Sequence, residues 1–98
     1  MNQYAILRRS GWRSGGDLEQ AAARSTQVGD EEMSQDIRWI RSYVLGEEDG
    51  QLGTVCIYEA SSPEAIRTHA SRARLAVDEI VAVADTVVVR PDPQGVAV

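Results

Sequence analysis

Residues 54–66 read TVCIYEASSPEAI, a strand pattern that passes directly into a helix start. The first part is rich in β-branched and aromatic residues, which favours a β-strand. Ser62 then stands where an N-cap belongs, Pro63 fits the first helical position, and Glu64 suits the positive end of the helix dipole. The stretch therefore predicts a strand, a sharp stop, and a helix that runs to about Arg74.

The segments on either side extend this alternation of strands and helices. Four stretches have the length and composition of strands, over residues 2–9, 37–45, 54–60 and 79–89. A polar, glycine-rich segment, 46–53, joins the middle two, which predicts an antiparallel hairpin. Between the first two stretches we expect a helix that begins at Leu18 with Asp17 as its N-cap, and that breaks or bends at Gly29 and Asp30.

The resulting order, β-α-β-β-α-β, predicts an α+β fold of the ferredoxin-like type, with a four-stranded antiparallel sheet and both helices on one face. The pattern contains no internal boundary, so we expect one domain over residues 1–93 and a flexible C-terminal tail over 94–98. The sheet face without helices needs another cover, because large apolar patches are rare on monomers. We therefore expect a homodimer.

Composition narrows the classes of function. The chain of 98 residues carries a net charge of −5, which argues against binding to nucleic acid, because phosphate neutralisation needs clustered basic residues. No apolar run has the length of a membrane span, and the N-terminus lacks the apolar stretch of a secretory signal. The single cysteine agrees with a reducing compartment. We expect a cytoplasmic protein that binds neither nucleic acid nor membranes.

Strict alternation along the two middle strands predicts one face that is aromatic and hydrogen-bonding. If the helices cover the aliphatic side chains, the open face of the sheet carries Trp39, Arg41, Tyr43, Cys56 and Tyr58. Apolar walls with a few placed polar groups are typical of a small-molecule pocket. Aromatic side chains are also enriched at subunit interfaces, so both interpretations of this face stay open.

Three residues carry further hypotheses of their own. Arg41 could bind a carboxylate or phosphate of a ligand, or pair with Glu59 or another acid of the chain. Cys56, in the middle of a strand, is more typical of a buried small hydrophobe than of a nucleophile. His69, the single histidine, is a candidate general acid–base, although a lone histidine on the flank of a helix is more often a surface or capping residue.

The run from Trp39 to Pro93 resembles a bacterial family of small proteins of unknown function that includes nickel-binding, ferredoxin-like proteins from actinomycetes. The likeness is densest at W-I-R-S-Y-V, V-C-I-Y-E-A and S-S-P-E-A-I-R-x-H-A. The resemblance implies a dimeric ferredoxin-like domain and nickel as a candidate cofactor. It leaves Cys56, Glu59 and His69 as metal candidates. Many members carry His where this chain has Arg41, and a guanidinium does not ligate nickel.

Three functional hypotheses follow from these observations. The first is a small-ligand or metal-binding protein that uses the open sheet face. The second is a small enzyme on the same scaffold, such as an isomerase, a cyclase or a cofactor-independent oxygenase, with His69 or a tyrosine as acid–base. The third is an interaction protein whose open face serves assembly alone. The fold does not choose among them, because function depends on the site.

Overall fold

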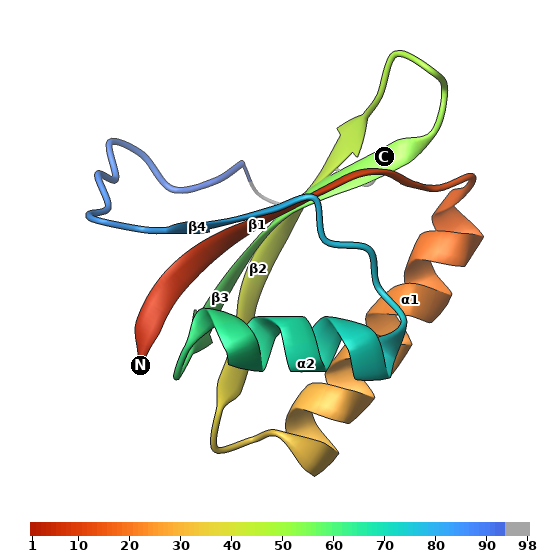
Figure 1. Ribbon diagram of the computed structural model, residues 1–98. Helices are drawn as coiled ribbons and strands as arrows, with labels where there is room; N and C mark the ends of the chain where they lie inside the picture. Colours follow the sequence, from red (N-terminus) through yellow and green to blue (C-terminus); the bar gives the residue numbers. More distant parts are fainter. Residues whose placement is uncertain (94–98) are drawn as a thin grey trace.

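The computed structural model describes residues 1–93 and forms one sheet with two helices packed across it (Figure 1). The predicted flexible tail, 94–98, lies outside the described residues. The elements in chain order are β1 (Asn2–Trp12), α1 (Gly15–Gln27), a π-helical turn η1 (Val28–Glu32), β2 (Ile37–Gly46), β3 (Leu52–Ala60), α2 (Pro63–Ala73) and β4 (Glu79–Ala82).

The four strands lie in the order β2-β3-β1-β4, and each neighbouring pair is antiparallel. The predicted α+β fold, with a four-stranded antiparallel sheet, is therefore confirmed. β1 lies in the middle of the sheet, between β3 and β4, and its inward side chains Tyr4 and Ile6 belong to the core.

The core forms where α2 and the turn η1 pack on one face of β1 and β3. Its buried side chains are Tyr4, Ile6, Val28, Met33, Ile37, Cys56, Tyr58, Ala60, Ile66 and Ala73. The apolar spacing of α2 predicts one inward stripe, and its members Ile66, Ala70 and Ala73 are all buried. Full burial of a side chain such as Ile66 stabilises the fold by roughly 1.5–3 kcal/mol.

The two helix starts differ in how well the sequence predicts them. Ser62 caps α2 as expected, and its Oγ accepts a hydrogen bond from the Ala65 backbone N–H at 3.1 Å. The predicted N-cap Asp17 is wrong, because α1 begins one turn earlier at Ser14, whose Oγ accepts from the Asp17 N–H at 3.2 Å. Asp17 instead lies inside the first turn, where its charge favours the helix dipole.

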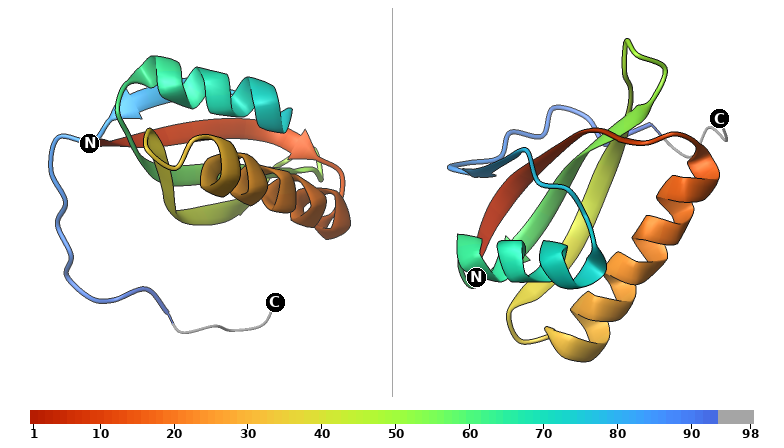
Figure 2. Two further views of the ribbon diagram at one scale, coloured as in Figure 1. Left: turned by 90° about the horizontal axis from the view of Figure 1, so that it is seen from below. Right: turned by 45° about the vertical axis from the view of Figure 1, so that its right-hand side comes forward.

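The end of β4 is set by the start of its partner strand, β1. The prediction of a strand to residue 89 is wrong, because β4 ends at Ala82. Ala82 lies opposite Tyr4, and the Val83 N–H still donates to the Gln3 carbonyl at 2.9 Å. Since β1 begins at Asn2, the chain beyond this point has no partner strand, and it leaves the sheet on the side away from α2 (Figure 2).

The predicted break at Gly29 is a π-helical turn that continues α1 without a gap. The turn buries Val28 and leads to Met33, both part of the core. Such turns bend a helix locally while keeping its backbone hydrogen-bonded. The bend therefore carries the chain from α1 to the start of β2 at Ile37.

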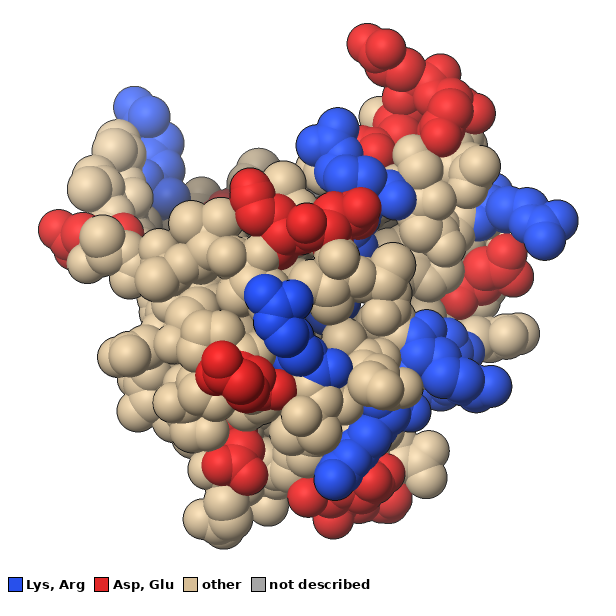
Figure 3. All heavy atoms as spheres, viewed as in Figure 1, with Lys and Arg blue, Asp and Glu red and all other residues tan. Residues whose placement is uncertain are grey.

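Charged side chains of both signs alternate over the face seen in Figure 3, and an acidic group marks the loop between β2 and β3. That loop carries Glu47, Glu48 and Asp49. Within residues 1–93, no helix combines the length and the apolar character needed to cross a membrane.

Replacement of Ser62 by Ala tests the helix start that decides the fold. The variant loses the cap on the Ala65 N–H, so we expect its free energy of unfolding in urea to fall by about 1 kcal/mol. Ser71→Ala, on the exposed side of the same helix, is the control and should change stability by less than about 0.5 kcal/mol. Equal effects of the two substitutions would contradict the assignment.

Candidate functional site

A β-bulge in β2 separates the side chains that strict alternation placed on one face. Trp39 pairs with Tyr58 and Arg41 pairs with Ile57, so Ile40 is an extra residue in β2. The extra residue reverses the alternation of every side chain after it. The prediction of one shared open face is therefore wrong, because the strand changes its inward side at Ile40.

The predicted site residues divide into two groups. Trp39, Cys56 and Tyr58 lie on the face covered by the helices, where they line one cavity. Arg41 and Tyr43 lie on the opposite face, where they line a separate hollow beneath the segment that follows β4. The bulge was not predictable from local sequence, because its residues, Ile40 and Arg41, carry no turn signal.

On the face away from the helices, Arg41 forms an ion pair within the chain. Its Nη1 lies 2.7 Å from Asp92 Oδ2, and the Tyr43 hydroxyl donates to the same carboxylate at 2.8 Å. Contacts with Tyr43 and Asp92 raise the pKa of Arg41. Glu59, the predicted alternative partner, pairs instead with Arg38 at 2.9 Å. The acid that binds Arg41 thus comes from the far end of the chain.

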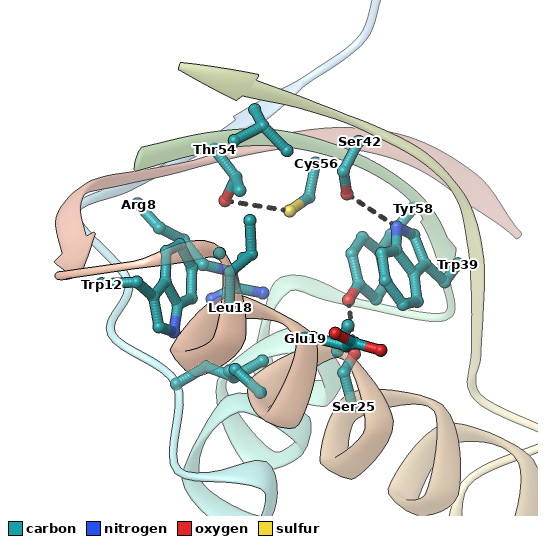
Figure 4. A pocket seen from close by; sticks show the side chains of 15 residues that line it. Arg8, Trp12, Leu18, Glu19, Ser25, Trp39, Ser42, Thr54, Cys56 and Tyr58 are labelled. Atoms are coloured by element: carbon teal, nitrogen blue, oxygen red, sulfur yellow. Dashed lines mark hydrogen bonds between the residues drawn. The ribbon is translucent and has the colours of Figure 1, made fainter. Parts of the chain in front are cut away.

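The cavity on the other face lies between α1 and the strands and has a volume of about 340 Å³ (Figure 4). Most of its wall is apolar, with Trp12, Leu18, Ala22, Val44 and Leu75. Its polar lining is Arg8, Glu19, Ser25, Ser42, Thr54 and Tyr58. A volume of this size and an apolar wall with few polar groups are typical of small-molecule sites.

Arg8 is the polar residue that sequence analysis overlooked. It follows Tyr4 and Ile6 on the inward face of β1 and is 1% exposed. Its Nη1 donates to the Ala76 carbonyl at 2.6 Å, while Nη2 has no hydrogen-bond partner among residues 1–93. A buried charged group with unmet hydrogen bonds is costly. The signal that could have revealed it was an arginine at an inward position of the Tyr4–Ile6 alternation.

Next to Arg8, a buried chain of polar groups joins the sheet to both helices. Tyr58 Oη lies 2.9 Å from Ser25 Oγ, and His69 Nε2 lies 3.0 Å from the Ser25 carbonyl oxygen and 3.5 Å from Ser25 Oγ. The Trp39 ring stacks on Tyr58 with a centroid distance of 6.1 Å and an interplanar angle of 8°. The Trp39 Nε1–H donates to Ser42 Oγ at 2.8 Å. This hydrogen bond holds the indole ring of Trp39 as an aromatic lid over the phenol ring of Tyr58.

Burial controls the protonation of this cluster. Desolvation raises the pKa of Tyr58, although the hydrogen bond to Ser25 and the charge of Arg8 oppose the shift. Desolvation likewise lowers the pKa of His69, and the nearby Arg8 cation acts in the same direction. His69 is therefore a buried neutral imidazole, and the alternative of a surface residue is wrong because only 1% of it is exposed.

The three metal candidates do not come together in one site. Cys56 Sγ contacts Thr54 Oγ1 at 3.3 Å in the cavity wall, whereas Glu59 pairs with Arg38 on the opposite sheet face. Across the described part of the chain, no group of three or more His, Cys, Asp or Glu side chains is placed to hold a metal ion. The donor set of residues 1–93 therefore does not fit a nickel centre.

Comparison with known proteins supports the resemblance found in the sequence. The family model described as nickel responsive protein SCO4226-like matches residues 4–83. The crystal structure of SCO4226 from Streptomyces coelicolor A3(2) is similar, with a TM-score of 0.71 and 21% identity over 87% of this chain and 99% of that chain. No curated protein matches. At this identity the structural likeness shows the fold alone.

The buried imidazole predicts a specific loss of stability in mild acid. Burial holds the pKa of folded His69 below its usual value, so the unfolded chain takes up a proton first as pH falls. We expect the melting temperature to drop as pH is lowered from about 7 to about 5, and to drop less in His69→Gln, which has no group that titrates there. Parallel curves for the two proteins, measured by circular dichroism, would contradict this account.

Proposed function

Because the chain belongs to the family of nickel responsive proteins described as SCO4226-like, whose role is undefined, we propose that this member binds a small organic molecule. The proposed site is the cavity between α1 and the sheet. It replaces the open sheet face as the location of binding, because Trp39 and Tyr58 lie on the face that the helices cover, and the bulge at Ile40 puts Arg41 on the opposite face.

The observation that carries the proposal is the unsatisfied guanidinium of Arg8. Nη2 is buried in the wall of a mostly apolar cavity and finds no acceptor in residues 1–93. A ligand with an anionic or strongly accepting group would supply the missing partner, and charge-assisted hydrogen bonds are the strong ones. The ligand is therefore a largely apolar molecule with one such group.

Glu19 at the cavity rim does not oppose an anion strongly. Its carboxylate is exposed to solvent, whereas Arg8 is buried. Charges in water are screened over about 8–10 Å at physiological salt, but buried charges are screened much less. The electrostatic preference of the cavity interior is thus set by Arg8.

Nickel binding by this member has less support than the binding of an organic molecule. The family description names nickel, but Cys56, Glu59 and His69 do not converge, and Arg41 cannot ligate. An enzymatic role has His69 and Tyr58 as its acid–base candidates, but only Tyr58 lines the cavity, and His69 is buried behind its ring. Binding is the function that the geometry supports most directly.

We also propose that the ferredoxin-like arrangement is used as a homodimer, with the partner on the sheet face away from the helices. The strand order β2-β3-β1-β4 supports the arrangement. Tyr43 and Val81 are 44% and 45% exposed, and Val87, Val88 and Val89 are 84%, 73% and 79% exposed. A second copy would remove this apolar surface from water.

Dye binding tests the ligand proposal. The probe is anilinonaphthalenesulfonate, and its uncharged counterpart, N-phenylnaphthylamine, is the matched control. Arg8→Met keeps the bulk of the side chain but removes the cation, so we expect affinity for the sulfonate dye, measured by fluorescence titration, to fall by about ten-fold or more. Affinity for the uncharged dye should change by less than about three-fold.

Arg9→Met is the control variant, because it removes the same charge one position away. Arg9 is exposed and pairs with Glu47 at 3.1 Å, so its loss should leave both dyes bound as before. If Arg8→Met and Arg9→Met weaken the sulfonate dye equally, the effect is one of net charge and the proposed site is wrong.

Light scattering coupled to size-exclusion chromatography tests the dimer. We expect the mass of a dimer for the natural chain and of a monomer for Val88→Asp, because a carboxylate on the proposed interface would be buried without a partner. Thr68→Asp, on the exposed side of α2, should stay dimeric. A monomeric natural chain, or a dimeric Val88→Asp variant, would contradict the proposed interface.

A further inference from the structure

We propose that Tyr58 is the second donor of the ligand site and that His69, acting through Ser25, directs the phenol proton into the cavity, so that the ligand is a carboxylate held between Tyr58 and Arg8. This inference rests on the proposed function, because it names the ligand class for the same cavity.

The direction of the hydrogen bonds begins at His69. Its Nε2 lies 3.0 Å from the Ser25 carbonyl oxygen, which can only accept, so Nε2 carries the proton. Nδ1 is then the bare nitrogen of a neutral ring, and no side chain or backbone group in the described residues contacts it as a donor. The ring is therefore locked in one tautomer, with a single N–H directed at Ser25.

The hydroxyl group of Ser25 links the His69 N–H to the Tyr58 hydroxyl. Its Oγ lies 3.5 Å from Nε2, and toward that N–H it can act only as an acceptor. The hydroxyl proton of Ser25 is thus free to point to Tyr58 Oη, 2.9 Å away. In this arrangement Tyr58 accepts from Ser25 and keeps its own proton for another partner.

Arg8 limits where the Tyr58 proton can go. A guanidinium has donors only, and the Arg8 cation lies near enough to lower the pKa of the Tyr58 hydroxyl against the effect of burial. Arg8 therefore cannot accept the phenol proton, and Ser25 donates to Oη in this arrangement, so the O–H of Tyr58 is directed into the cavity that Tyr58 and Arg8 both line (Figure 4).

Two adjacent donors define the ligand group more closely than Arg8 alone. The free Nη2–H of Arg8 and the O–H of Tyr58 meet two acceptors at once, as the two oxygens of a carboxylate do. The wall opposite is apolar, with Leu18, Ala22 and Val44. The ligand class is therefore a flat or compact apolar carboxylate, with its charged end toward β1 and β3.

Calorimetric titration with naphthoate tests this inference, with methyl naphthoate as the uncharged control. Tyr58→Phe removes only the hydroxyl, so we expect naphthoate to bind about ten-fold more weakly and the ester to bind within about three-fold of the natural chain. His69→Leu should lose part of the affinity for naphthoate, because no N–H then fixes the orientation of the Ser25 hydroxyl. His69→Gln should restore it, because the Gln side chain carries an N–H donor close to the position of Nε2.

The possible outcomes separate this inference from the proposed function. If Arg8→Met weakens naphthoate but Tyr58→Phe does not, the cavity binds anions without Tyr58 and the inference falls. If His69→Gln binds as weakly as His69→Leu, the role of His69 is packing and its directing role is wrong. If the natural chain binds the sulfonate dye but not naphthoate, the carboxylate class is wrong while the proposed function stands. If it binds neither probe, both fall.

Discussion

The bulge at Ile40 decides what each face of the sheet carries. Trp39 lies on the helix side of β2, and the one extra residue after it places Arg41 on the opposite side, while β3 continues its regular alternation beside it. Trp39 can therefore stack on Tyr58, and Tyr43 can reach Asp92. Without the extra residue, either the cavity would lose its aromatic lid or the far face would lose its ion pair, since one register cannot serve both.

The buried cation of Arg8 gives the cavity its chemical character. The small core of such a domain has little stability in reserve, and an arginine in its wall is destabilising unless its donors are met. The Ala76 carbonyl accepts from Nη1, whereas Nη2 is buried without an acceptor in residues 1–93. A buried arginine that lines a cavity and keeps one nitrogen without a partner in the described chain is the pattern expected of a binding site rather than of a structural ion pair.

Local signals predicted the elements, whereas long-range pairing decided the details that matter for the site. The Ser62 cap and the inward stripe of α2 depend on neighbouring residues, and both were predictable. The end of β4 depends on where β1 begins, and the bulge depends on the register with β3, so neither could be read from one segment. Arg41 meets Asp92 across 51 positions of sequence, which no local pattern indicates. Arg8 could have been identified from the alternation with Tyr4 and Ile6.

The contact between Arg8 and Ala76 has a kinetic consequence. Beyond Leu7, the edge of β1 is covered by residues 74–78 and not by a strand, and this connection is tied down by Arg8 Nη1 and by the bond from the Arg9 N–H to Asp78 Oδ2 at 2.6 Å. Within residues 1–93, its backbone is bonded to the β1 backbone only from the Asp78 N–H to the Leu7 carbonyl at 2.9 Å, so it opens more easily than a paired strand. The Arg8 guanidinium that would bind a ligand also bonds to residues 74–78. The dissociation rate of the ligand and the opening of this connection therefore depend on one side chain.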